Sequence, residues 1–335
     1  MFAILYLVCA VAMYAQDPAF DSNWEVVFQD GFTDFDSALW YKKEGQSHGT
    51  DEDEEPQIYK SSNAYIEDGK LVLKTTRLNH GVICQLGNAC HYNVHKHTIA
   101  SGEIMSNTTY KYGYYEMYAK IPNGQGYWPA FWLWNAGNCW YNEIDIFEGK
   151  GCLSNEVTNN LHWCFDCPIT NSSYINDTID YAQAFNYSYN YHWYGVEWNE
   201  DEIIWYIDRQ KVKSIANYMD GIGIQHPMYI IINLALYPQT SDCATDTSNV
   251  VLQKCMYVDQ VNVYKLKCDK NTVVNDIPCY SSFDYAVKKS ITLSNVSSLT
   301  IGQDIYLKAT DFIELHSGFE VPIGAQLSLQ TTPCE

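Results

Sequence analysis

Three carboxylates lie within the six residues Glu143-Ile144-Asp145-Ile146-Phe147-Glu148. Residues two apart in a β-strand share a face, so Glu143 and Asp145 point to one side and the two isoleucines to the other. Glu148 has the opposite parity, and one extra residue, a β-bulge, would return it to the acidic face. Like charges this close must have different pKa values. One carboxyl group could then attack while another donates a proton, which is the chemistry of glycosidic-bond cleavage.

An aromatic run precedes the acids, and turn residues 135–138 separate the two stretches. Trp128, Trp132 and Trp134 share one parity on this second predicted strand. Such rings either pack in a core or stack on the apolar faces of sugars. An isolated acidic triplet would more simply be a solvated strand face, but these aromatic neighbours favour a carbohydrate site.

Several short stretches, taken in order, make the chain resemble glycoside hydrolase family 16 over roughly residues 24–265. The stretches are Tyr112-Gly113-Tyr114-Tyr115-Glu116, Trp128-Pro129-Ala130-Phe131-Trp132, the acidic motif, His162-Trp163, Tyr194-Gly195-Val196-Glu197-Trp198 and Asn233-Leu234-Ala235. The E-x-D-x-x-E form resembles the branch that holds laminarinases, agarases, porphyranases and carrageenases, whereas lichenases carry E-x-D-x-E. The resemblance implies a jelly roll with a long concave cleft.

The resemblance also implies a role for each acid. Glu143 would be the nucleophile, Asp145 its modulating partner and Glu148 the general acid/base of a retaining mechanism. Further residues would contact the sugars or the acids. The expected substrate-binding residues are Asn63, Trp128, Trp132, His162 and Trp198. A structural histidine remained the alternative for His162.

No cofactor is expected to be required, but members of the family often carry a structural calcium. Asp259 matches one calcium ligand, whereas Asp30-Gly31-Phe32 has Gly where the common pattern has Glu. A structural calcium is therefore an open expectation. Cysteines and histidines in residues 84–97 could alternatively bind zinc, although their spacing matches no common pattern.

Composition restricts the partners. A net charge of −20 argues against nucleic acid, because no basic patch could neutralise phosphates. We expect a monomeric, secreted or cell-surface enzyme that acts on a polysaccharide. The leading substrate is β-1,3-glucan. The alternatives are red-algal galactans (agar, porphyran or carrageenan) and, in a different class, a non-catalytic glucan-binding protein, which usually lacks the catalytic glutamates.

Residues 1–15 are apolar, uncharged and end in small side chains, which predicts a secretory signal rather than a membrane span. Export predicts that most of the twelve cysteines form disulfides. Candidate pairs are Cys139–Cys152, Cys84–Cys90 and Cys164–Cys167.

Strand-like runs separated by turn signals, without helical periodicity, predict an all-β antiparallel sandwich. The catalytic domain should span residues 16–267, followed by a linker over 268–290. Residues 291–335 alternate apolar and polar side chains between glycines, and they predict a small C-terminal β module.

Overall fold

The structure is a computed structural model, and some segments lie outside its described residues. It describes residues 18–21, 24–45, 55–83, 96–136, 141–153, 155–164, 179–182, 187–200, 202–217, 224–238, 241–244, 254–268, 271–274, 282–284, 287–294 and 298–333. The expected signal segment, the Cys84–Cys90 and Cys164–Cys167 pairs and most of the alternative zinc cluster fall outside these ranges.

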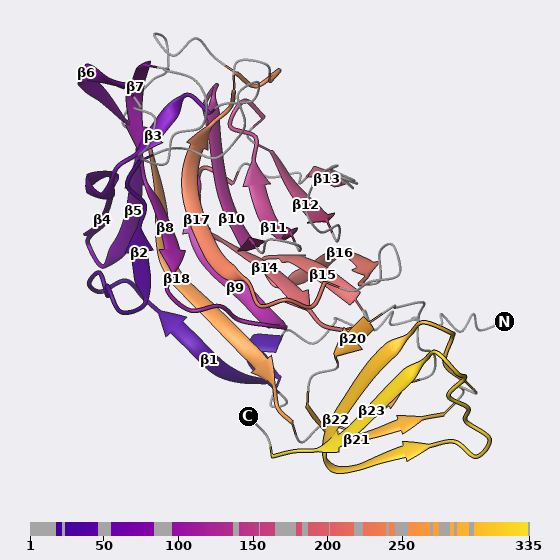
Figure 1. Cartoon of the computed structure of the whole chain (residues 1–335). Helices are drawn as coiled ribbons and strands as arrows, with labels where there is room; N and C mark the ends of the chain where they lie inside the picture. Colours follow the sequence, from indigo (N-terminus) through magenta and orange to yellow (C-terminus); the bar gives the residue numbers. More distant parts are fainter. Residues whose placement is uncertain are drawn as a thin grey trace, which may run out of the picture.

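Two antiparallel sheets pack face to face (Figure 1). The first runs β16-β15-β14-β9-β18-β5-β4, with β1 beside β18. Its strands are β1 (Trp24–Asp30), β4 (Ala64–Glu67), β5 (Lys70–Lys74), β9 (Gly113–Lys120), β14 (His192–Trp198), β15 (Glu202–Ile207), β16 (Gln210–Ala216) and β18 (Cys255–Leu266).

The second sheet runs β13-β12-β11-β10-β17-β8-β2 and carries the acidic motif on its central strand. Its strands are β2 (Trp40–Lys42), β8 (Glu103–Ser106), β10 (Tyr127–Ala136), β11 (Tyr141–Gly149), β12 (Glu156–Cys164), β13 (Ile179–Ala182) and β17 (Tyr229–Leu236). A third sheet combines β3 (Gln57–Tyr59), β6 (Thr76–Ile83) and β7 (Lys96–Ser101). The described residues hold only two short 3-10 helices, Pro18–Phe20 and Ser61–Asn63.

The core lies between the two large sheets, and strand alternation explains which residues enter it. On β9, Tyr115, Met117 and Ala119 are fully buried on one parity. On β11, Ile144 and Ile146 face them from the other sheet within the same cluster of buried residues. Burying an isoleucine contributes roughly 1.5–3 kcal/mol, so this parity fixes which face of β11 is left for the acids. The predicted all-β antiparallel sandwich is confirmed.

The C-terminal module is a parallel sheet, unlike the rest of the fold (Figure 1). It comprises β19 (Asn271–Val274), β20 (Ser282–Asp284), β21 (Lys288–Leu293), β22 (Asp304–Leu315) and β23 (Gln326–Thr331). The module begins earlier than the sequence predicts, because β19, β20 and the start of β21 lie within the expected linker 268–290. Lys288 also forms an ion pair with Glu200 of the sandwich, with Nζ 3.3 Å from the carboxylate and both side chains buried.

Candidate active site

The acidic strand β11 contains the bulge that its sequence predicts. Opposite β12, Asp145 pairs with Asn160 and Glu148 pairs with Thr158, so three steps along β11 match two along β12. The same irregularity interrupts the register with β10 between Phe131 and Trp132. Glu148 therefore shares a face with Glu143 and Asp145, and we call this outer side of the sheet the acid face.

The bulge frees backbone carbonyls inside the protein, and two core side chains bond to them. The Trp205 indole N–H donates to the Asp145 carbonyl at 2.9 Å from the opposite sheet. The buried Asn159 side-chain amide donates to the Ile146 carbonyl at 2.6 Å. An unpaired buried carbonyl costs about 1–3 kcal/mol, so these donors stabilise the bulged conformation. Sequence reasoning missed both residues, although a polar Asn159 on an otherwise apolar strand parity was an available signal.

His162 faces Glu143 across the strand register, as the resemblance implied. Its Nε2 lies 3.2 Å from an Asp145 oxygen and 3.7 Å from a Glu143 oxygen. Burial lowers the pKa of His162, but contact with Asp145 and the charges of Asp145 and Glu143 outweigh burial and raise that pKa to about 9. His162 is therefore an imidazolium at neutral pH, and it lies between the carboxyl groups of Asp145 and Glu143 as their positively charged neighbour.

Glu148 has a different environment from Glu143. Burial, followed by the charges of Asp145 and Glu143, raises the pKa of Glu148 well above its ordinary value. The Asn160 side-chain amide donates to the Glu148 carboxyl group, and the Thr158 hydroxyl lies 3.5 Å from the same oxygen. Glu148 is thus biased toward its protonated form, which is the form that a general acid needs.

Tryptophans of β10 border the acids on the acid face. Trp134 pairs with Glu143, and Trp132 pairs with Asp145. The Trp132 indole N–H donates to the Asn233 side chain at 3.0 Å, which fixes the ring. Trp132 is only 8% exposed, so its role in substrate binding stays a prediction. Trp134, whose shared parity was visible in the sequence, is half-buried beside it.

Trp128 lies at the Glu148 end of the same strand and is partly exposed. Its ring stacks on Tyr237 with centroids 4.7 Å apart and an interplanar angle of 3°. One face of the Trp128 ring is therefore covered by protein, and no local pattern indicated Tyr237 as its partner. Gly149, the last residue of β11, makes room for the Pro129 ring, because a Cβ atom at this position would lie 2.8 Å from it.

The role expected for Trp198 in substrate binding is wrong. Trp198 is fully buried in the core and donates its indole N–H to the Ile224 carbonyl at 2.9 Å. It shares strand parity with Tyr194 and Val196, which also face the core. A ring with no exposed surface cannot stack on a sugar.

The structure gives Asn63 a structural position. Asn63 is 5% exposed, and its side-chain amide donates to the Lys74 carbonyl at 2.6 Å and to the Thr76 hydroxyl at 2.9 Å. Both hydrogens of the amide are thereby engaged within the protein. We conclude that Asn63 supports the loop before β4 rather than offering this amide to a substrate hydroxyl.

The two carboxylates at the calcium site suggested by the resemblance contact groups of the protein itself. An Asp259 oxygen lies 2.7 Å from the Lys70 ammonium, which already neutralises that carboxylate. The Asp30 carboxylate accepts hydrogen bonds from the Phe32 amide at 2.8 Å and the Trp40 indole at 2.7 Å. These contacts give no support to Asp259 as a calcium ligand.

Within the described residues, Glu143, Asp145 and His162 form a group with possible ligand atoms within 4.8 Å of one another. A metal would require a neutral imidazole, since protonated histidine has no lone pair to donate. The raised pKa of His162 therefore favours an ion-pair cluster at this position.

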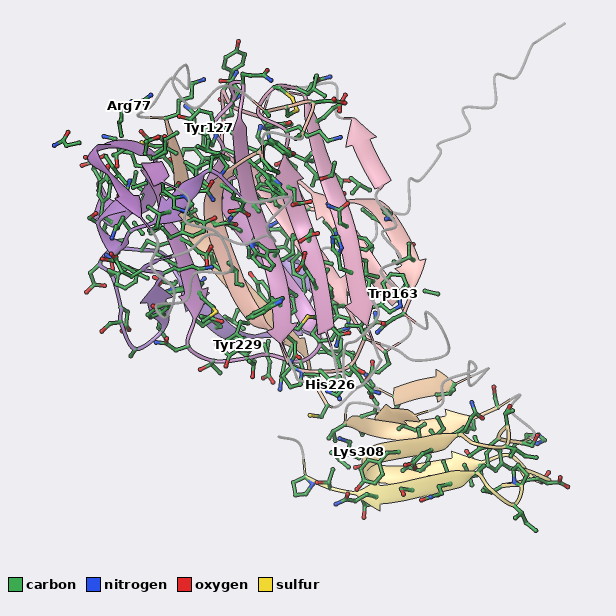
Figure 2. All side chains as sticks on the ribbon, turned by 45° about the horizontal axis from the view of Figure 1, so that its top comes forward. Arg77, Tyr127, Trp163, His226, Tyr229 and Lys308 are labelled. Carbon is green, nitrogen blue, oxygen red and sulfur yellow. A yellow bond between two sulfur atoms is a disulfide. The ribbon has the colours of Figure 1, made fainter. Side chains whose placement is uncertain are left out.

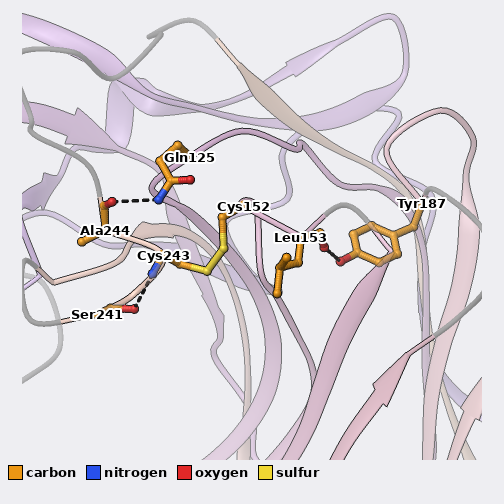
Figure 3. Close-up of a disulfide and its surroundings, with 7 residues drawn as sticks. All are labelled: Gln125, Cys152, Leu153, Tyr187, Ser241, Cys243 and Ala244. Atoms are coloured by element: carbon orange, nitrogen blue, oxygen red, sulfur yellow. Dashed lines mark hydrogen bonds between the residues drawn. A yellow bond between two sulfur atoms is a disulfide. The ribbon is translucent and has the colours of Figure 1, made fainter.

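A disulfide braces the loop after β11. Cys152 bonds to Cys243 of the loop that follows β17, not to Cys139 as the sequence suggested (Figure 3). The two cysteines are 91 residues apart, and strand order brings their loops together because β11 and β17 both pair with β10. Gln125 donates to the Ala244 carbonyl at 2.9 Å and ties a third loop to this corner.

The acid face extends along the sheet beyond these residues. Tyr229 pairs with Trp134 and continues the aromatic row onto β17. Tyr229 and His226 lie at the end of the sandwich nearest the C-terminal module (Figure 2).

The described residues contain no helix with the length and apolar character that a membrane crossing requires.

Comparisons with known proteins agree with this geometry. A model of the glycosyl hydrolases family 16 matches residues 52–254. Glucan endo-1,3-beta-glucosidase A1 of Niallia circulans is 28% identical over 279 residues, 74% of this chain and 39% of that protein. An endo-1,3-1,4-beta-glycanase of Rhizobium meliloti is 29% identical over 198 residues, 57% of this chain and 40% of that protein. The chain thus spans about two fifths of the length of these curated relatives.

The catalytic domain of an endo-1,3-beta-glucanase (laminarinase) from Thermotoga petrophila superimposes with a TM-score of 0.58 at 25% identity. The superposition covers 73% of this chain and 98% of that domain, and it confirms the jelly-roll fold. The family match includes the whole acid strand and its neighbours β10 and β12. The chain belongs to the glycosyl hydrolases family 16.

Proposed function

We propose that the protein is an endo-acting, retaining glycoside hydrolase that cleaves a β-linked polysaccharide, with β-1,3-glucan as its substrate. The observation that carries this proposal is the bulge in β11, which puts Glu148 on the same face as Glu143 in a different electrostatic environment. A retaining mechanism needs one ionised and one protonated carboxyl group on the same face.

In this mechanism Glu143 attacks the anomeric carbon while Glu148 transfers its proton to the leaving oxygen. A covalent glycosyl-enzyme forms, and Glu148, now a carboxylate, removes a proton from the incoming water. Water then displaces Glu143 and restores both groups. Asp145 and the His162 imidazolium lie against Glu143, where they hold its position and balance its charge as it is consumed and released.

The choice of β-1,3-glucan rests on the named activities of the relatives and on the acid face itself. The relatives are a glucan endo-1,3-beta-glucosidase and an endo-1,3-1,4-beta-glycanase. The partly exposed rings of Trp128 and Trp134 offer stacking surface to neutral sugar rings. A strongly anionic chain would meet repulsion from a protein of net charge −20. Red-algal galactans are the second candidate substrate.

We further propose secretion or display at the cell surface. The Cys152–Cys243 disulfide and the disulfide-bonded Cys268 support this, because such bonds persist mainly in oxidising compartments.

The decisive experiment incubates the protein with laminarin, lichenan, agarose, porphyran and carrageenan, and then analyses the products by size. We expect a ladder of oligosaccharides from laminarin. The Glu143→Gln protein should bind laminarin in an affinity gel but release no oligosaccharides, because it keeps the binding surface and lacks the nucleophile. Cleavage of a galactan, without cleavage of laminarin, would show that the substrate is that galactan and not β-1,3-glucan. Binding of laminarin by wild type without cleavage of any polysaccharide would favour a glucan-binding protein.

A further inference from the structure

The indole nitrogen of Trp128 is buried on the acid face, although part of the ring is exposed. Among the described residues it has no aligned hydrogen-bond partner, which is unusual for a buried tryptophan N–H. Trp128 shares strand parity with Ala130, and Ala130 pairs with Glu148. Trp128 is therefore a diagonal neighbour of Glu148, at a separation that an aromatic side chain can bridge. Ala130 has no side-chain atom beyond Cβ to fill the space between them.

The Trp128 indole acts directly on the Glu148 carboxyl group. Burial is the main cause of the raised pKa of Glu148, followed by the charges of Asp145 and Glu143 on the same strand. The charge of His162 on β12 and the Trp128 N–H on β10 oppose this rise in pKa. The N–H thus lies close to Glu148 and favours its ionised form, but the two are not aligned in a hydrogen bond in this arrangement.

The direction of the Trp128 ring is fixed by the loop that carries Tyr237. The two rings are stacked almost parallel, with an interplanar angle of 3°. The Tyr237 amide donates to the Gly126 carbonyl at 2.9 Å, and the Gly126 amide donates to the Cys243 carbonyl at 3.0 Å. Cys243 is bonded in turn to Cys152 of the loop that follows β11 (Figure 3). One braced corner therefore holds both rings and sets where the indole N–H points.

We propose that Trp128 is a positioning residue for Glu148. When Glu148 is ionised, the indole N–H donates a hydrogen bond to its carboxylate, and the stack on Tyr237 preserves the direction of that donor. This role rests on the proposed function, in which Glu148 becomes a carboxylate once it has protonated the leaving oxygen. The donor then holds the carboxylate in place for the incoming water. The role is additional to the sugar stacking that the sequence predicts for Trp128.

NMR of the wild-type protein across a pH range tests the contact directly. The indole ¹⁵N–¹H signal of Trp128 is assigned by its through-space contacts to the Tyr237 ring. The carboxyl ¹³C signal of Glu148 is assigned by its absence from Glu148→Gln. We expect both signals to shift with the same midpoint, because the hydrogen bond forms as Glu148 ionises. Separate midpoints, or an indole signal that does not respond to pH, would overturn the proposal.

Trp128→Phe keeps an aromatic ring against Tyr237 and removes the N–H donor. The pKa of Glu148 should then rise by about one unit, and the alkaline limb of kcat/KM should move to higher pH by a similar amount. Trp193→Phe is the matched control, because Trp193 on β14 of the other sheet also stacks on a tyrosine, with its centroid 4.8 Å from that of Tyr118. It should leave the Glu148 midpoint and the pH profile unchanged.

The Glu148 midpoint also separates this proposal from the proposed function, because it is measured without substrate. A raised midpoint in Trp128→Phe, in a protein that cleaves no polysaccharide, would support the contact and refute the hydrolase. Hydrolysis by wild type, together with equal Glu148 midpoints in wild type and Trp128→Phe, would support the hydrolase and refute the contact.

Discussion

Asn160 lies opposite Asp145 in the strand register, yet its side-chain amide donates a hydrogen bond to Glu148. The bulge between Asp145 and Glu148 brings the second glutamate back along the acid face to within reach of Asn160. A donor aimed at the carboxylate stabilises its ionised form and orients it. Asn160 is therefore placed to limit how far burial raises the pKa of Glu148.

Asn160→Ala should slow hydrolysis and shift its pH profile. We expect kcat/KM to fall by about tenfold, since a misoriented acid transfers its proton less efficiently. The alkaline limb should move to higher pH because the pKa of Glu148 rises when the donor is lost. Rates measured across the pH range check both effects. Asn107→Ala, at an exposed site remote from the acid strand, is the control, and an unchanged limb in Asn160→Ala would contradict this role.

Asn159 should affect both stability and catalysis, because its side chain supports the bulge that aligns Glu148. Asn159→Ala leaves the buried Ile146 carbonyl without its side-chain donor, which should lower the free energy of unfolding by about 1–3 kcal/mol. Because the bulge aligns Glu148, we also expect kcat to fall at temperatures where the protein is fully folded. Val157→Ala is the matched control, since Val157 is buried on the same strand and a cavity there lowers stability without unpairing the bulge. Equal kcat in the two variants would show that Asn159 serves stability alone.

Local patterns in the sequence predicted the centre of the site correctly. Parity and one bulge placed Glu143, Asp145 and Glu148 on a common face, because both depend only on neighbouring residues. Trp198 was misplaced although the same parity rule applied, since Tyr194 and Val196 mark its side of β14 as the core side.

Long-range pairing could not be predicted in the same way. Cys152 meets Cys243 because strand order places their loops together, and no local spacing encodes that order. Trp205 reaches the Asp145 carbonyl from the opposite sheet for the same reason. In the module, alternation of apolar residues indicates strands but not their direction. The parallel arrangement, in which Ile291 lies opposite Ile313, is therefore known only from the structure.

Stability should fall as pH rises through the pKa of His162. That pKa rises from 6.5 to about 9 on folding, so the folded state binds the proton more tightly. The resulting contribution is complete below pH 6.5 and is lost as pH rises through about 9. The shift corresponds to roughly 3 kcal/mol.

Thermal melting of wild type and His162→Gln at intervals between pH 6.5 and 9 isolates this contribution, since other titrating groups are common to both proteins. The wild-type melting temperature should fall more steeply over this range than that of the variant. Parallel curves would mean that His162 is not held as an imidazolium by Asp145 and Glu143.

The final prediction joins Glu148 to the stereochemistry of the reaction. Because the bulge puts Glu148 and Glu143 on one face, we expect double displacement and products that first appear with the substrate's anomeric configuration. NMR of the earliest products from a β-linked glucan should show β-anomers that mutarotate later. Initial α-anomers would mean inversion and a carboxyl separation wide enough to hold a water molecule.

Glu148→Ala should discriminate between leaving groups. Polysaccharide cleavage needs protonation and should slow by about 10²–10⁴-fold, whereas activated aryl glycosides should slow far less at the first step. Azide should restore part of the aryl glycoside turnover, because this anion attacks the glycosyl-enzyme without needing a base. The product would then be a β-glycosyl azide, since two inversions retain configuration. An α-glycosyl azide, or equal slowing of both substrates, would contradict Glu148 as the acid/base and Glu143 as the nucleophile.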